Sequence, residues 1–330
     1  MGLQQNLNDI QTNLLSAKTA IAQSISNKGV ECSADDKLST FAEKIDSISG
    51  GSTGGTGEKF VVPNGLKFGY SSEFDPTMFD VSQVIDMSRM FYYCTELTNL
   101  DLSTWNVDNV INMSSIFNRC SKLTNINVST WNTSQVTNMN SMFFSGITLA
   151  SINISNFNTS NVTDMSSMFS SCEKLTKLDL SNFSTSNVTD MSSMFSSCKK
   201  LTELNVSNFN TSNVTDMYYM FSSCEKLTKL DLSNFSTSNV TDMGGMFNNC
   251  GSLTNLQLND LGRNEQCKKL DLSYCSKLTK DSVLYLFNNA FDRTAAGYTA
   301  AFTIKLNATT KALLSEDEIA IATNKGFTVV

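Results

Sequence analysis

The sequence contains no histidine, and this absence narrows the chemistry that the chain can perform. Histidine is the commonest general base near neutral pH and the commonest metal ligand. The sequence also lacks a G-x-S-x-G element, a phosphate-binding P-loop, an H-E-x-x-H zinc motif and any C-x-x-C pair. We therefore expect no enzymatic activity, no cofactor and no bound metal.

The charge balance and the short apolar runs argue against two further classes of protein. The chain carries 24 Lys and Arg against 31 Asp and Glu, a formal net charge of −7, which disfavours a nucleic-acid partner held by a basic face. No apolar run approaches the roughly 20 residues that a membrane-spanning helix requires. The start, MGLQQNLNDIQTNLL, has neither the basic nor the unbroken apolar segment of an export signal. We expect a soluble protein without membrane insertion and without an encoded export signal.

A unit of 26 residues occurs seven times between residues 79 and 250, most clearly as LTKLDLSNFSTSNVTDMSSMFSSC at residues 175–198. One methionine recurs at this spacing, at Met87, Met113, Met139, Met165, Met191, Met217 and Met243. A phenylalanine recurs with it, at Phe91, Phe117, Phe143, Phe169, Phe195, Phe221 and Phe247. Such a fixed period is typical of a solenoid of stacked repeats.

Each repeat has two halves with different apolar spacing. The segment LTKLDL at residues 175–180 has the leucine spacing of an entry turn followed by a short strand. In residues 188–198 the Met, Phe and Cys side chains stand at i, i+3, i+4 and i+7, which predicts a two-turn helix with Thr189 or Asp190 as its N-cap. The predicted fold class is an α/β solenoid of leucine-rich repeats, each a strand plus a short helix.

The pattern LxxLDLSxFxTSNVTDMSxMFxxC resembles the BspA-type leucine-rich repeats of bacterial and phage surface proteins, also described as the DUF285 repeat. The resemblance covers about half of the chain and recurs in all seven units. It implies the solenoid fold, and it leaves the bound partner open because repeat solenoids have many partners.

Six of the nine cysteines occupy one position in their repeats: Cys94, Cys120, Cys172, Cys198, Cys224 and Cys250. Gly146 takes this position in the third repeat. Because each repeat offers a single thiol on an apolar face, we interpret the six as a reduced core column rather than as disulfides or metal ligands.

Two columns of acidic and amide side chains run through the repeats. The first consists of Asp86, Asn112, Asn138, Asp164, Asp190, Asp216 and Asp242. A calcium ladder is one interpretation, but the position before each predicted helix favours N-capping. The second consists of Asp101, Asn127, Asn153, Asp179, Asn205 and Asp231. We interpret it as a solvated strand face rather than as paired catalytic carboxylates.

Residues 1–49 predict a helical segment for attachment and oligomerisation. Its apolar residues alternate four and three apart, as in a coiled coil: Leu3, Leu7, Ile10, Leu14, Ala17 and Ile21. We expect this coiled-coil-like seam to form a homotrimer. The alternative is that it packs on a second helix, residues 35–48, in a hairpin.

Part of this segment resembles the N-terminal segment of tailed-phage tail and fibre proteins. The matching letters are AIA at 20–22, KGV at 28–30 and LSTFAEKI at 38–45. In those proteins the segment lies at the end that attaches to the particle. The resemblance therefore implies that other virion proteins bind the N-terminal helices.

The remaining chain divides by composition. Residues 50–57 are a Gly/Ser/Thr linker, 58–78 an N-terminal cap, 79–250 the seven repeats, and 251–330 a C-terminal cap with degenerate repeats. Within the last part we predict helices at 281–291 and 315–323, the second with a capping box of Ser315 and Glu318, and strands at 301–306 and 326–330. The tail LSEDEIAIATNKGFTVV resembles the unit that closes BspA-type proteins.

A few exposed positions depart from the repeat and are candidate ligand or partner residues. They are the tyrosine pairs and the charged residues of the strand face: Tyr92, Tyr93, Tyr218, Tyr219, Lys177, Glu203 and Lys229. Tyrosine buries a large area at low entropic cost, so it is a favoured contact residue. The alternative is that a solvent-facing surface tolerates these residues without any contact role.

From these observations we predict a bacteriophage virion structural protein, a tail or head fibre that is assembled in the host cytoplasm and binds a host-surface glycan or protein. The absence of an encoded export signal and the phage-like N-terminal segment favour this interpretation. The alternative is a BspA-like adhesin on a bacterial cell surface.

Overall fold

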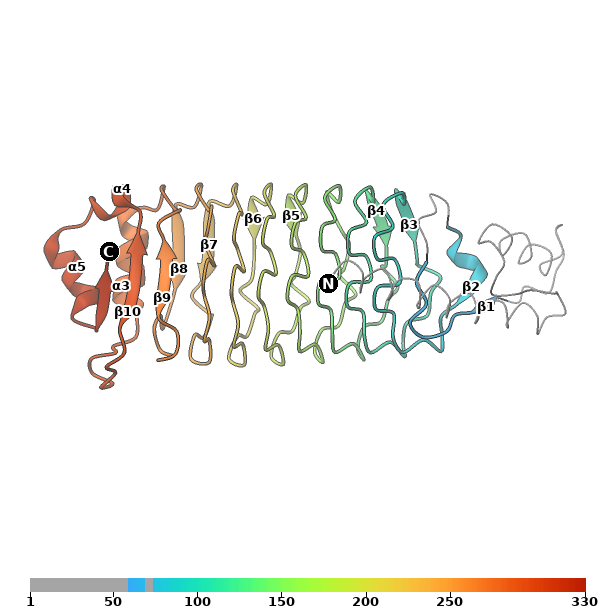
Figure 1. The fold of residues 1–330 in the computed structure, drawn as a ribbon, viewed down its shortest axis with the longest axis horizontal. Coiled ribbons are helices and arrows are strands. Elements are labelled where there is room, and N and C mark those ends of the chain that lie inside the picture. The colour runs from blue at the N-terminus through green and yellow to red at the C-terminus, as the bar shows by residue number, and fades with distance from the viewer. Residues whose placement is uncertain (1–58, 69–73) are drawn as a thin grey trace, which may run out of the picture.

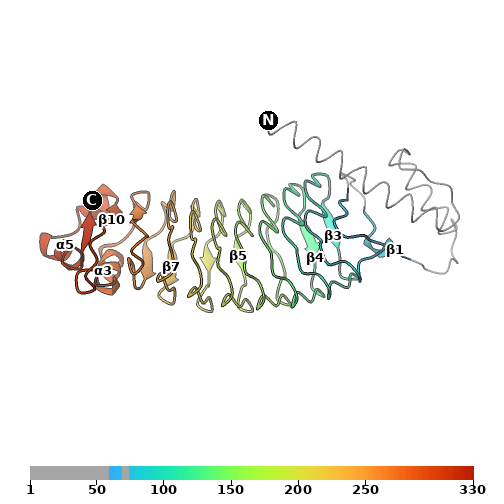
Figure 2. The same ribbon diagram turned by 60° about the horizontal axis from the view of Figure 1, so that its bottom comes forward.

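The computed structural model describes residues 59–68 and 74–330, which form an elongated β-solenoid (Figure 1). Successive coils lie side by side along the long axis in the order of the sequence, and Figure 2 shows the same stacking from a second direction. The predicted helical segment at 1–49, with its homotrimer seam, and the linker at 50–57 lie outside the described residues.

Short parallel strands form one side of the coils. They are β1 (Phe60–Val61), β2 (Phe79–Asp80), β3 (Asn99–Asp101), β4 (Asn125–Asn127), β5 (Lys177–Leu178), β6 (Glu203–Leu204), β7 (Lys229–Leu232), β8 (Asn255–Leu258), β9 (Lys269–Leu272), β10 (Phe302–Leu306) and β11 (Phe327–Val329). Leu100 of β3 pairs with Ile126 of β4, and Leu230 of β7 pairs with Leu256 of β8. Both pairs are 26 residues apart, so the stacking confirms the predicted period. The strands form several small sheets rather than one continuous sheet.

The prediction of a short helix in each repeat is wrong. In the described chain the helices lie outside the seven repeat turns: the 3₁₀ helix η1 (Pro76–Met78), then α3 (Lys280–Asn289), α4 (Ala308–Lys311) and α5 (Glu316–Thr323). Residues 191–197 instead form consecutive tight turns, in which Ser193 and Ser197 have positive φ angles of 56° and 60°. The fold is therefore a β-solenoid with little helix, not an α/β solenoid.

Hydrogen bonding explains why turns replace the predicted helix. The N–H groups of Met191, Ser193 and Phe195 donate to carbonyl groups of the next coil, at 3.1, 2.7 and 2.9 Å. The N–H of Met194, between them, donates within its own turn to Met191, at 3.2 Å. An α-helix directs its backbone donors along its own axis and would leave the coils without these bonds. The hydrogen bonds between coils thus offset the free-energy cost of a positive φ angle at serine.

The apolar columns predicted from the spacing are buried. All seven phenylalanines of the repeat are at most 2% exposed, and the methionine column is equally buried. The rings of Phe117 and Phe143 stack with centroids 5.6 Å apart and an interplanar angle of 15°. This stack continues from coil to coil as far as Phe247, so one core runs along the solenoid.

Aromatic side chains gather at the N-terminal end of the described solenoid. Phe68 and Phe74 contact Phe91, with ring centroids 5.2 and 5.1 Å apart, and both contact Trp105. Asn64 accepts the backbone N–H of Ile85 at 2.7 Å. These contacts cover the end of the phenylalanine stack, which would otherwise face solvent.

A different arrangement closes the C-terminal end, where β9, β10 and β11 form a three-stranded sheet and α3 packs against α5. Figure 1 labels β9, β10, α3 and α5 at this end of the solenoid. The predicted helices and strands of this region agree with α3, β10, α5 and β11 within one or two residues at most boundaries. The predicted capping box is confirmed, because Ser315 and Glu318 exchange their side-chain and backbone hydrogen bonds. The buried Arg293 lies beside the rings of Phe302 and Phe327.

Candidate functional site

The first acidic column holds the turns and does not cap helices. Asp190 accepts the backbone N–H of Ser192 through Oδ1 at 2.8 Å, and no helix follows. The same bond to the residue two positions later recurs at Asp86, Asn112, Asn138, Asp164, Asp216 and Asp242. The predicted N-cap role is therefore wrong, although the hydrogen bond is of the same chemical type. In the described part of the chain, no group of three or more His, Cys, Asp or Glu side chains is placed to hold a metal ion.

Asp216 lies between two other carboxylates of this column, Asp190 and Asp242. Burial raises the pKa of its carboxyl group, and the carboxylates of Asp190 and Asp242 raise it further, against a hydrogen bond from the Tyr218 backbone that lowers it. Parallel bridges join Asp216 to both neighbours. The stacking thus brings like charges together, which is an electrostatic cost of the repeat.

The side chains of the second acidic column also accept hydrogen bonds from backbone N–H groups. Asp179 accepts the backbone N–H of Ser181 at 3.0 Å, and Asp231 accepts that of Ser233 at 2.9 Å. The backbone and side-chain hydrogen bonds from Ser181 lower the pKa of the Asp179 carboxyl group. Both side chains face solvent, as predicted, while one oxygen of each holds a backbone turn.

The charged candidates Lys177, Glu203 and Lys229 occupy equivalent positions on β5, β6 and β7. Lys177 pairs with Glu203 in the strand register, and its Nζ lies 3.2 Å from Oε2 of Glu203. Both side chains are 72% exposed, so this ion pair contributes little to stability. These groups are therefore accessible to a charged ligand.

The tyrosine pair Tyr92–Tyr93 lies near the N-terminal end. The two side chains are 38% and 42% exposed, and their ring centroids are 6.2 Å apart. The Arg89 guanidinium lies 6.0 Å from the centroid of the Tyr92 ring. The pair is an exposed aromatic and cationic surface of a kind that suits partner contact.

The pair Tyr218–Tyr219 lies elsewhere and has a different shape. It follows Met217, whereas Tyr92–Tyr93 follows Phe91, so the pairs occupy different turns of the repeat. The rings of Tyr218 and Tyr219 meet edge to face, with centroids 4.1 Å apart. The structure thus brings the members of each pair together but does not join the two pairs into one site.

Sequence reasoning missed two residues beside Tyr218 and Tyr219. Gly244 and Gly245 occupy the equivalent positions of the next coil, and the tyrosine rings lie against them. A Cβ at Gly244 would be 3.1 Å from the Tyr218 ring, and a Cβ at Gly245 would be 2.6 Å from Cε1 of Tyr219. The available signal was the Gly-Gly dipeptide 26 residues after Tyr-Tyr, where other repeats have larger residues.

The cysteine column is buried and reduced, as predicted. Each thiol of the column donates to a phenylalanine carbonyl of the preceding coil, for example Cys198 to Phe169 at 3.2 Å. Burial raises the pKa of the Cys172 thiol to about 12. The thiols therefore satisfy buried backbone oxygens and carry no reactive thiolate.

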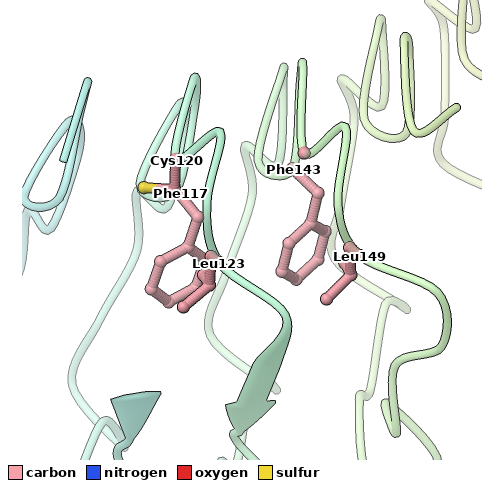
Figure 3. A pocket seen from close by; sticks show the side chains of 6 residues that line it. Phe117, Cys120, Leu123, Phe143 and Leu149 are labelled. Atoms are coloured by element: carbon pink, nitrogen blue, oxygen red, sulfur yellow. The ribbon is translucent and has the colours of Figure 1, made fainter. Parts of the chain in front are cut away.

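Gly146 interrupts this column and leaves a small cavity of about 10 Å³. Figure 3 shows its lining, with the rings of Phe117 and Phe143, the thiol of Cys120 and the side chains of Leu123 and Leu149. The cavity is apolar and far smaller than a ligand. We interpret it as a packing defect rather than as a binding site.

No curated protein matches the sequence. No helix in the described residues has the length and apolar character needed to cross a bilayer. The family described as Mycoplasma protein of unknown function, DUF285, matches residues 67–178, 119–205 and 176–270. These overlapping matches span more than half of the 330 residues and coincide with the solenoid, so the chain belongs to the DUF285 family.

Proposed function

We propose that this protein acts on a bacterial cell surface, where its solenoid binds a ligand outside the cell. One observation carries the proposal: the interior repeats with little change, whereas a few exposed positions depart from the repeat. The Phe and Met columns are buried throughout, while Tyr92, Tyr93 and Tyr218 are 38%, 42% and 42% exposed. Large exposed rings that the fold does not require are typical of contact surfaces.

The charged residues Lys177, Glu203 and Lys229 form the second part of the proposed contact surface. Their side chains follow one another along the strand side of the coils. A glycan or a protein of the host surface is the expected partner. The acidic columns serve backbone turns, and we propose a binding role without catalysis.

A virion fibre is the second candidate function. It rests on the resemblance of residues 1–49 to the N-terminal segment of tailed-phage tail and fibre proteins, and these residues lie outside the described part of the chain. The family match carries the name of a bacterial genus and covers the solenoid only. It supports the bacterial alternative better than the virion, so we place the cell surface first and keep attachment through the N-terminal helices with the second candidate.

Protease treatment of intact source cells tests the location. We expect mass spectrometry to find peptides of residues 79–250 among those released from the cell exterior, with a cytoplasmic protein as the control for lysis. Recovery only from purified phage particles would establish the second candidate instead. Recovery only from the cytoplasm would contradict both.

Binding of the labelled full chain to host cells tests the contact surface. Lys177→Glu should weaken binding because it removes a positive charge from the contact surface and places a second carboxylate beside that of Glu203. The double variant Lys177→Glu with Glu203→Lys restores the ion pair in reverse and is the matched control for stability. Equal binding by all three proteins would remove the charged column from the contact surface.

A further inference from the structure

A hollow of about 180 Å³ lies where the regular repeats end. One wall is the last regular turn, with Thr241, Asp242, Met243 and Gly244. The other wall is the segment 266–269, which follows the polar insertion after β8. Each wall combines polar groups with one apolar side chain, Met243 or Cys267, unlike the wholly apolar cavity beside Gly146.

The hollow exists because the column of bridged turns stops at Asp242. In the preceding coil, the N–H of Tyr219 donates to the carbonyl of Gly244 at 2.9 Å. The equivalent N–H of Gly245 makes no hydrogen bond to any residue that the structure describes. The insertion thus leaves a backbone donor available beside the hollow, where an ordinary repeat would have used it.

An aromatic surface adjoins the hollow. The ring of Tyr218 lies against Gly244, which lines the hollow, and 42% of Tyr218 is exposed. Tyr219 lies in the same way against Gly245. A serine at Gly245, the residue that this position has in several other coils, would collide with the Tyr219 ring. The Tyr-Tyr and Gly-Gly substitutions therefore form one structural unit.

The remaining lining supplies hydrogen-bonding groups of both kinds. Asp242 uses Oδ1 for the N–H of Gly244 at 2.6 Å, which leaves its second carboxylate oxygen as an acceptor. Gln266 is exposed and offers a side-chain amide, a donor and an acceptor. Lys268 donates from Nζ to the carbonyl of Glu265 at 2.7 Å, and its two other donors remain.

We propose that this hollow binds a single pyranose ring of a glycan. A sugar ring has an apolar C–H face that packs on an aromatic ring and hydroxyl groups that exchange hydrogen bonds with carboxylate and amide groups. Tyr218 supplies the aromatic ring for the apolar face of the sugar. Asp242, Gln266 and the Gly245 N–H supply the hydrogen bonds to its hydroxyl groups. A few polar groups converge on a concave surface, and an exposed aromatic ring lies against one of its lining residues, Gly244, which is a composition that suits a small-ligand site. The inference deepens the proposed binding function and rests on it.

Saturation-transfer NMR on the full chain tests the site, with glucose, N-acetylglucosamine and glucuronic acid as probes. We expect transfer to the ring protons of at least one sugar, with a dissociation constant on the order of 1 mM, a value typical of a shallow single-ring site. Replacing Tyr218 and Tyr219 by serine should abolish the signal. This variant should fold, because Ser192 and Ser193 occupy the same positions in an earlier coil, with φ at Ser193 also positive.

Two further variants separate the site from general effects. Gln266→Ala should weaken binding at least several-fold without altering the repeat. Tyr274→Ala removes a tyrosine that is 52% exposed but is not among the nearest neighbours of Gly244 or Gly245, and its signal should equal that of the unchanged chain.

Two results would overturn the inference: no transfer to any of the three sugars, or transfer that persists unchanged in the serine and Gln266→Ala variants. If the full chain still binds host cells in either case, the sugar site fails and the proposed binding function stands. If cell binding also fails, the proposed function falls with it.

Discussion

The Sγ atom of Cys172 donates a hydrogen bond of 3.3 Å to the carbonyl oxygen of Phe143. The same carbonyl accepts the backbone N–H of Gly146 at 3.1 Å, so it has one partner within its own coil and one from the next. A thiol is a weak donor with apolar character, so it supplies the second partner and remains compatible with an apolar core. The cysteine column is thus a hydrogen-bonding element of the stacking rather than a redox element.

Gly146→Cys should stabilise the protein, because it fills the cavity and restores the missing thiol opposite the Phe117 carbonyl. Filling a cavity of this kind raises the free energy of unfolding by about 0.5–2 kcal/mol. Urea unfolding followed by circular dichroism measures the change. Gly146→Ala is the control and should give a smaller gain. A loss of stability in both variants would show that the 3.2 Å approach of a Cβ to the Phe143 carbonyl is not relieved.

Phe195→Ala should destabilise the protein strongly. The side chain is fully buried and stacks with Phe169 and Phe221, at centroid distances of 6.0 and 5.7 Å. The loss of burial and the cavity left behind should cost about 3–5 kcal/mol in the free energy of unfolding. Thr189→Ala in the same coil changes an exposed side chain and should cost far less. A near-neutral Phe195→Ala would contradict a continuous core.

The period, the buried columns and the reduced thiols could be predicted because each depends on residue type at a fixed spacing. The helix could not be distinguished from the turns in this way. Met191, Met194, Phe195 and Cys198 point inward in both conformations, since two successive tight turns place the same positions inside as two helical turns. The difference lies in the backbone donors, and side-chain spacing carries no information about their partners.

The hollow beside Gly244 could not be predicted for another reason. It needs the polar insertion to return to the turn side of the last coil and place Gln266 and Lys268 opposite Asp242. The path of a non-repeating segment depends on tertiary packing, which spacing along the chain does not encode. The tyrosine pair itself was visible as a departure from the repeat.

The buried thiols should not react with a water-soluble disulfide reagent while the protein is folded. Burial raises the pKa of Cys172 and of Cys250 to about 12, so the thiolate is scarce at mildly alkaline pH. In a Cys32→Ser variant, which removes the thiol outside the described residues, eight thiols remain. We expect almost none of these eight thiols to react with a chromogenic disulfide reagent in the native protein. All eight thiols should react when the protein is unfolded in guanidinium chloride. Rapid reaction of a native thiol would indicate that its coil opens.

Removal of the N-terminal segment tests the predicted homotrimer. Light scattering should give the mass of a trimer for the full chain and of a monomer for a chain beginning at Glu58, because the coiled-coil-like seam at residues 3–27 is then absent. The shortened chain should retain the circular dichroism spectrum of the solenoid. A monomeric full chain would instead favour the intramolecular helical hairpin.

Asp216→Asn should stabilise the protein in a pH-dependent manner. Burial and the flanking carboxylates raise the pKa of Asp216 above its ordinary value of 3.8, so the folded state disfavours the charged form. Below the ordinary pKa the carboxyl is protonated in both states and carries no penalty. As the pH rises from there through the raised pKa, the unfolded state loses its proton first and the wild type loses stability.

The variant has no such charge, and asparagine at Asn112 and Asn138 shows that an amide oxygen holds the same turn. Its advantage over the wild type should therefore be near zero in acid and reach its full value at neutral pH, as measured by urea unfolding at several pH values. Asp216→Ala is the control, because it removes the acceptor of the Tyr218 N–H and should cost about 1 kcal/mol at low pH, where charge plays no part. A pH-independent gain for Asp216→Asn would show that the burial of this charge and its repulsion by the neighbouring carboxylates are not what destabilises the coil.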